Sequence, residues 1–267
     1  MTGSIGLHGG GEFGHDDGPF LGALLRAAEA SRAVRDRACA GVGPGGSIGT
    51  EALRIAILPT AAAGSRPDLA VEHGRIAFQR TAASLGTAVR VEGIDVLTRP
   101  DAERGGPAGR LVGADLVYLV GGDPGHLLDV LDGSLAWRSV LAAHARGAVV
   151  AGASAGAMAL GERSWTPDGP RPALGLVPRV AVVPHYDPER HRTWATEVTR
   201  RGDHSPLGWL GLDEATGIVR EHGGGTGADH RGDARDWRIH GPGLVRWFPP
   251  AGRSVGPLGE GSTLRLG

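Results

Sequence analysis

The stretch AVVAGASAGAMAL, residues 148–160, joins a strand, a sharp turn and a helix. The apolar run 148–151 predicts a buried strand, and residues 155–160 predict a helix that begins directly after Ser154. The turn between them matches the Gly-x-Ser-x-Gly pattern of a nucleophile elbow, in which small residues let the strand and the helix pack closely beneath a strained serine. The alternative is a small-residue turn with a capping serine. The strand before the turn and the helix after it favour the nucleophile.

The chain before this stretch alternates strands and helices. Apolar runs predict strands at residues 4–8, 53–58, 88–91 and 115–120, and helical patterns cover residues 19–37, 67–85 and 135–146. Several strands are continuously apolar, which is typical of parallel strands buried on both faces. We therefore predict an α/β fold with a mostly parallel central sheet and helices on both faces. The active site of such a sheet forms at the carboxyl ends of its strands.

The pattern after Ser154 is shorter and richer in strands. Strands are expected at residues 180–183, 210–212, 217–219, 237–240, 244–248 and 263–266, with one helix near residues 188–201. We expect this strand-rich C-terminal part to complete the same sheet, with an edge hairpin or two. The glycine-rich stretches 41–50 and 223–235 predict surface loops and do not separate two domains. Residues 1–267 are therefore predicted to form a single domain.

Composition excludes several classes of partner. The chain has 267 residues, 28 Lys and Arg against 29 Asp and Glu, and a formal net charge of −1. This balance gives no field that favours nucleic acid or an anionic membrane. The first residues lack the pattern of a signal peptide, and no apolar run is long enough for a membrane span. Cys39 is the only cysteine, which excludes an intramolecular disulfide and fits a reducing compartment. We expect a cytoplasmic protein, and a homodimer is left open.

A second glycine motif, His8-Gly-Gly-Gly11, matches the oxyanion-hole motif of esterases with the α/β-hydrolase fold. The chain order argues against such an esterase, because its strands should precede this motif and here at most one does. An acid and then a histidine should also follow the serine on separate strand ends. His240 is the last histidine, and Asp233 and Asp236 precede it too closely. We interpret the motif as a glycine turn at the edge of the site.

Another arrangement places polar residues at successive strand ends. Gly122 and Asp123 follow the strand 115–120, His185 follows the strand 180–183, and Glu214 follows the strand 210–212. The Gly122 or Asp123 N–H can provide one donor to an oxyanion. The Ala155 N–H, at the start of the helix after Ser154, can provide the other.

Five segments in this order resemble the peptidase E/cyanophycinase family of serine peptidases, whose fold is similar to class I glutamine amidotransferase domains. The segments are GGGE (9–12), LVGGD (119–123), GASAGAM (152–158), PHY (184–186) and GLDEAT (211–216). The resemblance implies that Ser154 is the nucleophile, that His185 is its general base and acid, and that Glu214 orients the histidine. It also implies a small peptide or amide substrate, either an aspartyl peptide or a cyanophycin-like β-aspartyl-arginine bond, cleaved through an acyl-enzyme.

The sequence departs from both branches of this family. Asp123 follows the glycine pair where the dipeptidases carry Asn, and Pro124 stands where the cyanophycinases carry Gln. The resemblance places Tyr186, Arg190 and Arg192 near the substrate. The two arginines also open a predicted helix, where solvated arginines are common, and this second interpretation is slightly favoured.

Two other carboxylates compete with Glu214 for the third position of the triad. Asp187 lies only two residues after His185, and Asp168 lies in a turn where aspartate commonly caps its own backbone. Glu214 is favoured because it follows an apolar strand and is flanked by small residues. An esterase or acyltransferase with the same serine, or a non-catalytic binding relative, remains the alternative function.

No cofactor or metal is expected. Residues 41–46 match the Gly-x-Gly-x-x-Gly pattern of dinucleotide sites, but they follow a helix instead of a strand. His8, His15, Asp16 and Asp17 lack metal-ligand spacing, and a solvated loop is the favoured interpretation. Cys39 is not at the elbow, which argues against a cysteine-dependent amidotransferase.

Overall fold

The structure is a computed structural model that describes residues 2–40, 51–187, 189, 207–220, 236–250 and 253–266. Its helices are α1 (Gly18–Ala40), α2 (Pro67–Leu85), α3 (Arg99–Ala102), α4 (Gly105–Val112), α5 (Pro124–Leu131), α6 (Leu135–Ala145) and α7 (Ala155–Leu160). Two 3-10 turns are η1 (His15–Asp17) and η2 (Thr60–Ala62). The first sheet contains β1 (Ile5–His8), β2 (Leu53–Leu58), β3 (Val89–Gly93), β4 (Leu116–Leu119), β5 (Val149–Ala153), β10 (Gly217–Arg220), β11 (Asp236–His240) and β14 (Thr263–Arg265). The second contains β6 (Arg163–Thr166), β7 (Gly169–Pro172), β8 (Val180–Val183), β9 (Gly208–Leu212), β12 (Val245–Phe248) and β13 (Val255–Leu258).

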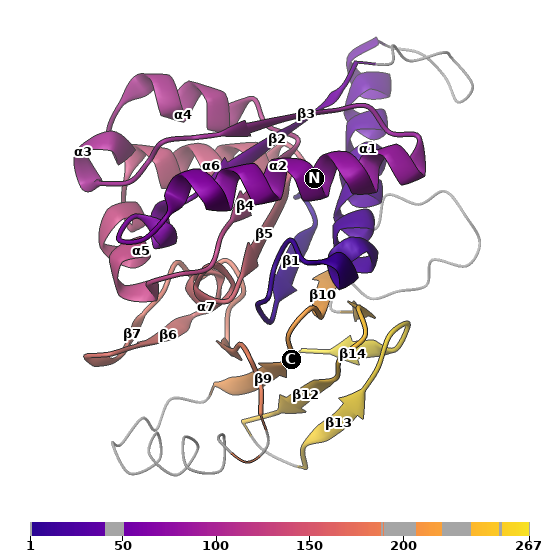
Figure 1. The fold of residues 1–267 in the computed structure, drawn as a ribbon, viewed down its shortest axis with the longest axis vertical. Coiled ribbons are helices and arrows are strands. Elements are labelled where there is room, and N and C mark those ends of the chain that lie inside the picture. Colours follow the sequence, from indigo (N-terminus) through magenta and orange to yellow (C-terminus); the bar gives the residue numbers. More distant parts are fainter. Residues whose placement is uncertain are drawn as a thin grey trace.

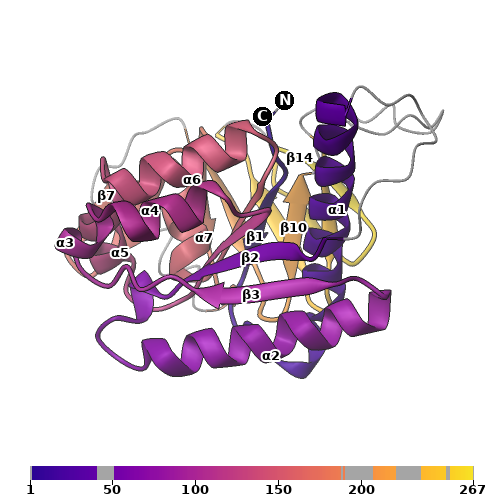
Figure 2. The same cartoon turned by 90° about the horizontal axis from the view of Figure 1, so that it is seen from above.

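The first sheet has helices on both faces (Figures 1 and 2). Strand β4 shows why its sequence is continuously apolar, because Leu116 and Tyr118 pack into one hydrophobic cluster with α1 and α2. Val117 and Leu119 alternate with them and pack into the other cluster, which includes residues of α4 to α7. All four side chains are fully buried. A strand covered on both faces has no polar face, which explains the apolar runs in the sequence.

The strand order of the first sheet is β14-β11-β10-β1-β5-β4-β2-β3 among the described residues. The pairings from β1 through β5, β4 and β2 to β3 are parallel. Those from β1 through β10 and β11 to β14 are antiparallel. Parallel pairing is therefore confined to the strands from β1 to β3 in this order. On the other side of β1, the C-terminal strands extend the sheet by antiparallel pairing.

The expectation of one sheet is wrong. The C-terminal strands divide between the first sheet and a second one, whose described order is β13-β12-β9-β8-β6-β7. This division could not be seen in the sequence because the parallel partners β8 and β9 are separated by more than twenty positions, and strand pairing over such separations leaves no local pattern. The strands β9, β12 and β13 are seen below β10 in Figure 1.

Most predicted elements are present with small changes at their ends. Strand β2 and helices α2 and α7 have the predicted bounds. Helices α3, α4 and α5 and strands β6, β7 and β13 were not predicted. The loops expected at 41–50 and 223–235 lie outside the described residues. The helix expected near residues 188–201 also lies outside them, except for residue 189. None of the described helices is both long and apolar enough to cross a bilayer.

The register of the first sheet brings its functional strand ends together. His8 at the end of β1 pairs with Ala153 at the end of β5. Gly152 pairs with Leu119, the last residue of β4. Because these three strands are parallel, the segments that follow them leave the sheet at one edge. The glycine turn, the Gly-Gly turn and the serine turn therefore meet there, as the sequence predicted.

Packing of the second sheet depends on a glycine. A Cβ at Gly208 would lie 1.8 Å from Cη2 of the buried Trp247. We predict that Gly208→Ala lowers the free energy of unfolding by about 1–3 kcal/mol through overpacking. Gly105→Ala is the control, because nothing lies within 4 Å of its Cβ position at the start of α4. Urea unfolding of both variants measures the difference, and equal stability would contradict this account of the sheet.

Candidate active site

Ser154 sits on a turn that only small neighbours allow. A Cβ at Gly152 would lie 2.5 Å from the carbonyl carbon of Gly156. A Cβ at Gly156 would lie 2.3 Å from the carbonyl oxygen of Leu119 on β4. The backbone of Ser154 itself has φ 47° and ψ −113°, a conformation that residues with side chains seldom adopt. The predicted strain and close packing of a nucleophile elbow are thus both present.

The three side chains of the predicted triad form a continuous chain of contacts. Ser154 Oγ lies 2.9 Å from Nε2 of His185. Nδ1 of the same ring lies 2.8 Å from Oε1 of Glu214. Both distances are those of hydrogen bonds. This order of hydroxyl, imidazole and carboxylate is the arrangement that activates a serine for attack.

The glycine turn after β1 supports the other two triad residues. The Gly9 carbonyl accepts a hydrogen bond from the His185 N–H at 2.7 Å, and the Gly10 carbonyl accepts one from the Ala215 N–H at 2.8 Å. Gly10 has φ 113°, and a Cβ there would lie 2.2 Å from Cε1 of the His185 ring. The imidazole therefore rests directly on the glycine backbone. The interpretation of this motif as a glycine turn at the edge of the site agrees with this contact.

Of the candidate acids, Glu214 is the one that the structure brings to the histidine. Asp168 is exposed in the turn between β6 and β7, and Asp187 accepts a local hydrogen bond from the Glu189 N–H at 2.8 Å. Asp213, beside Glu214, is turned toward β12, where its carboxylate accepts the Leu244 N–H at 2.9 Å. The two adjacent carboxylates thus face different partners, and they do so at a turn after β9 and not along an extended strand.

The oxyanion donors predicted from the sequence need one correction. The Asp123 N–H donates to the carbonyl of Ala61 at 2.8 Å, and the Asp123 side chain accepts N–H groups at the start of α5. The Asp123 N–H is therefore already used in a hydrogen bond within the protein and is not an oxyanion donor. The Gly122 N–H and the Ala155 N–H donate to no protein acceptor within the described part of the chain. Gly122 has φ 140°, and a Cβ there would lie 2.2 Å from the Ala61 oxygen, so this turn requires glycine.

Glu12 is a site residue for which the sequence analysis predicted no role. Its Oε1 accepts the Gly121 N–H at 2.7 Å. An atom at the Cβ position of Gly121 would lie 2.8 Å from this oxygen and 3.2 Å from Cβ of Ser154, so the carboxylate and the serine are neighbours across Gly121. Glu12 ends the GGGE segment, and its place at the end of a glycine run was the only sequence pattern that pointed to it.

Of the three residues expected to contact substrate, the structure describes Tyr186 alone. The Tyr186 ring packs over the backbone of Gly211, 6.1 Å from the Phe248 ring, with the Arg246 guanidinium 5.7 Å from its centroid. Burial raises the pKa of Tyr186, with further upward contributions from Asp213 and Asp187 that Arg246 opposes. Its phenol is therefore protonated at neutral pH. Arg190 and Arg192 lie outside the described residues.

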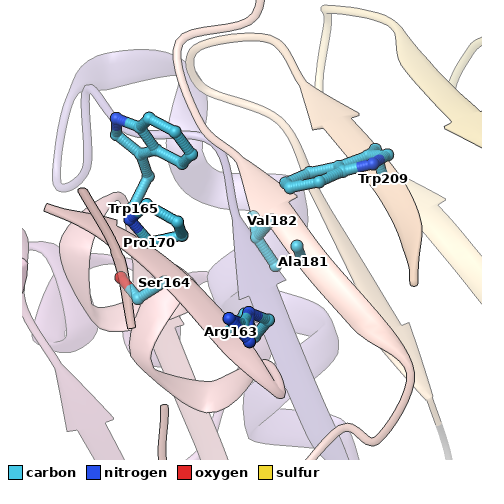
Figure 3. Close-up of a pocket in the computed structure, with 7 residues that line it drawn as sticks. All are labelled: Arg163, Ser164, Trp165, Pro170, Ala181, Val182 and Trp209. Atoms are coloured by element: carbon cyan, nitrogen blue, oxygen red, sulfur yellow. The ribbon is translucent and has the colours of Figure 1, made fainter. Parts of the chain in front are cut away.

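A pocket lies on the second sheet. Trp165 and Trp209 flank it, with Ala181 between them and Arg163 at one end (Figure 3). None of the triad residues lines this pocket. Among the described residues, no group of three or more His, Cys, Asp or Glu side chains is arranged to hold a metal ion. The site itself offers a hydroxyl, an imidazole, a carboxylate and backbone N–H groups.

Comparisons with known proteins bear on the family and on the fold. The sequence model of peptidase family S51 matches residues 47–226. A crystal structure of a peptidase from an acI-B1 Actinobacterium is similar over 100% of this chain and 98% of its own, with a TM-score of 0.71 and 23% identity. A putative peptidase E protein from Listeria monocytogenes EGD-e is similar over 82% and 94% of the two chains, with a TM-score of 0.50 and 18% identity. No curated protein matches the sequence.

The contact between Gly10 and the His185 ring gives a direct test of the site geometry. We predict that Gly10→Ala lowers kcat about 100-fold, because a methyl group there must push the imidazole out of reach of Ser154. Gly18→Ala, at the start of α1, is the matched control, since nothing lies within 4 Å of its Cβ position. Turnover of both variants on one peptide substrate measures the effect. A Gly10→Ala enzyme as active as the control would show that the ring does not depend on this support.

Proposed function

The chain belongs to peptidase family S51, and from this premise we propose that it is a serine peptidase or amidase with the triad Ser154, His185 and Glu214. The observation that carries the proposal is the pair of contacts at the His185 ring, 2.9 Å to the Ser154 hydroxyl and 2.8 Å to the Glu214 carboxylate. The glutamine amidotransferase-like character of the fold is part of the same proposal.

In the proposed mechanism, Ser154 Oγ attacks the substrate carbonyl while Nε2 of His185 takes the hydroxyl proton. Glu214 accepts the Nδ1 hydrogen bond, keeps the ring in the tautomer that leaves Nε2 free, and stabilises the imidazolium that forms. The Gly122 and Ala155 N–H groups donate to the oxyanion. His185 then gives its proton to the leaving amine, and an acyl-enzyme on Ser154 remains. Water, deprotonated by the same histidine, releases the acid product.

The proposed substrates are small aspartyl peptides or a cyanophycin-like β-aspartyl-arginine bond. This choice rests on the family alone, because the arginines expected to meet a substrate carboxylate lie outside the described residues. A panel of α-aspartyl dipeptides, β-aspartyl-arginine and cyanophycin therefore defines the substrate. Activity on short p-nitrophenyl esters with none on any aspartyl peptide would instead favour an esterase or acyltransferase with the same serine.

The role of the nucleophile is tested by Ser154→Ala. We predict that this variant loses at least about a thousandfold in kcat, because the remaining groups can only bind the substrate and stabilise the oxyanion. Hydrolysis of the best substrate of the panel measures the loss, and thermal unfolding confirms that the variant is folded. Full amidase activity in Ser154→Ala would refute the assignment. Failure of wild-type Ser154 to react with a fluorophosphonate, with a small acidic ligand still raising the Tm, would indicate a non-catalytic relative.

The third triad position is tested by three conservative substitutions. We predict that Glu214→Gln lowers kcat by about 100- to 10,000-fold, because a neutral amide stabilises the imidazolium poorly and can select the wrong tautomer. Asp168→Asn and Asp187→Asn serve as controls with the same change of charge, and we expect both to retain most of the activity. A larger loss in either control than in Glu214→Gln would transfer the role to that aspartate.

A further inference from the structure

A second imidazole and carboxylate lie directly beneath the active site, and the proposed mechanism does not use them. Nε2 of His8, at the end of β1, lies 2.7 Å from Oδ1 of Asp17, and both side chains are completely buried. The sequence analysis assigned these two residues to a solvated loop, which is wrong for them. It holds for His15 and Asp16, whose side chains are 96% and 68% exposed. The buried pair needs an explanation because burial of a carboxylate is unfavourable unless its partners compensate.

The partners of the pair are backbone groups of the glycine turn. The Gly10 N–H donates to Nδ1 of His8 at 3.3 Å, so the ring proton is on Nε2, which faces Asp17. The other Asp17 oxygen, Oδ2, accepts the Phe13 N–H at 2.6 Å. The pair therefore holds residues 10 and 13, where φ is 113° and 69°, conformations that persist only when their surroundings impose them. Two apolar side chains of the same size could not accept these N–H groups.

Aromatic side chains surround the pair. The Phe20 ring lies 4.8 Å from the His8 ring. The ring of the fully buried Tyr118 lies 5.1 Å from the Phe13 ring. Burial raises the pKa of Tyr118 well above its usual value, and the charges of Asp17 and Glu12 raise it further. The phenol therefore stays protonated and adds no second negative charge beside Asp17.

The opposite side of the same turn contacts every catalytic segment. It accepts the backbone N–H of His185 and of Ala215, supports the His185 ring, and binds the Gly121 N–H through Glu12. The His8 carbonyl also accepts the Ser154 N–H at 3.0 Å. We propose that His8 and Asp17 are positioning residues, a buried imidazole–carboxylate pair that fixes the glycine turn and thereby the triad. This inference rests on the proposed function of that triad.

Two substitutions of His8 separate positioning from stability. In His8→Asn, the amide oxygen takes the place of Nδ1 and still accepts the Gly10 N–H, but Asp17 loses its partner. In His8→Gln, the amide reaches the place of Nε2 and retains Asp17, but the Gly10 N–H loses its acceptor. We expect His8→Gln to lower kcat about 10- to 100-fold with little change in KM, as a displaced catalytic group would. His8→Asn should lose more stability and less kcat.

Two further variants complete the experiment. Asp17→Asn keeps the shape of the side chain but places a neutral amide, in place of the carboxylate, opposite the His8 Nε2–H. We expect it to lower kcat about as much as His8→Gln does. His144→Gln is the matched control, a second buried histidine whose Nδ1 contacts the Ala148 carbonyl at 3.1 Å, before the start of β5 and so at the opposite end of the sheet from the site. We expect it to lose stability with kcat unchanged. All rates are measured well below the Tm of each variant, by peptide hydrolysis and by the rate of fluorophosphonate labelling.

The outcomes are distinct. If kcat falls in the same order as Tm across the four variants, or if His8→Gln and Asp17→Asn retain wild-type kcat, the pair has only a structural role and the inference is overturned. If the His8 variants do not fold, Asp17→Asn against His144→Gln decides the same question. If the wild-type protein neither cleaves a substrate nor becomes labelled, the proposed function fails and this inference fails with it.

Discussion

The backbone of Gly156 lies so close to the carbonyl of Leu119 that a Cβ at Gly156 would be 2.3 Å from its oxygen, and the serine turn depends on this approach. Any side chain at position 156 would separate α7 from β4 and open the turn. With glycine there, Ser154 is held in a backbone conformation that it would not adopt in a free peptide. The strain is local, but the packing that imposes it involves three parallel strands whose ends are in register. The position of Ser154, the proposed nucleophile, is therefore a property of the whole sheet.

The glycine turn after β1 relates the other catalytic segments to this fixed serine. Segments that are far apart in the chain meet on residues 8–12 through hydrogen bonds to backbone groups. Backbone groups suit this task because they lack the rotamer freedom of side chains, so each bond defines a position closely. Glycine is needed at Gly10 for a second reason, since its missing side chain leaves room for the His185 ring. The same turn therefore accepts the hydrogen bonds that position these segments and leaves room for the His185 ring.

The sequence predicted what local patterns encode. Helix α2 was predicted with its observed bounds from its helical pattern and the proline at its first turn, and in the structure Gly86 ends it in the left-handed conformation. Helix α4 was missed because Gly105, Gly106 and Gly109 lower its helix propensity, while its burial on α6 compensates. The three residues of the proposed triad lie within hydrogen-bond distance of one another, and the sequence pointed to them because each follows a strand. Asp17 and Glu12 were not recognised, because their roles depend on a turn with positive φ at Phe13 that no sequence period describes.

The exposure of the proposed acid makes this positioning more important. The Glu214 side chain is 67% exposed and the His185 side chain 47% exposed, so water screens the attraction between carboxylate and imidazolium. An exposed glutamate also has several rotamers, and a weak attraction alone would not select one. The backbone on either side of Glu214 is fixed instead, by the Ala215 N–H on Gly10 and by the Asp213 carboxylate on the Leu244 N–H. The geometry of this triad is thus maintained mainly by the backbone contacts that surround it, and less by the charge of its acid.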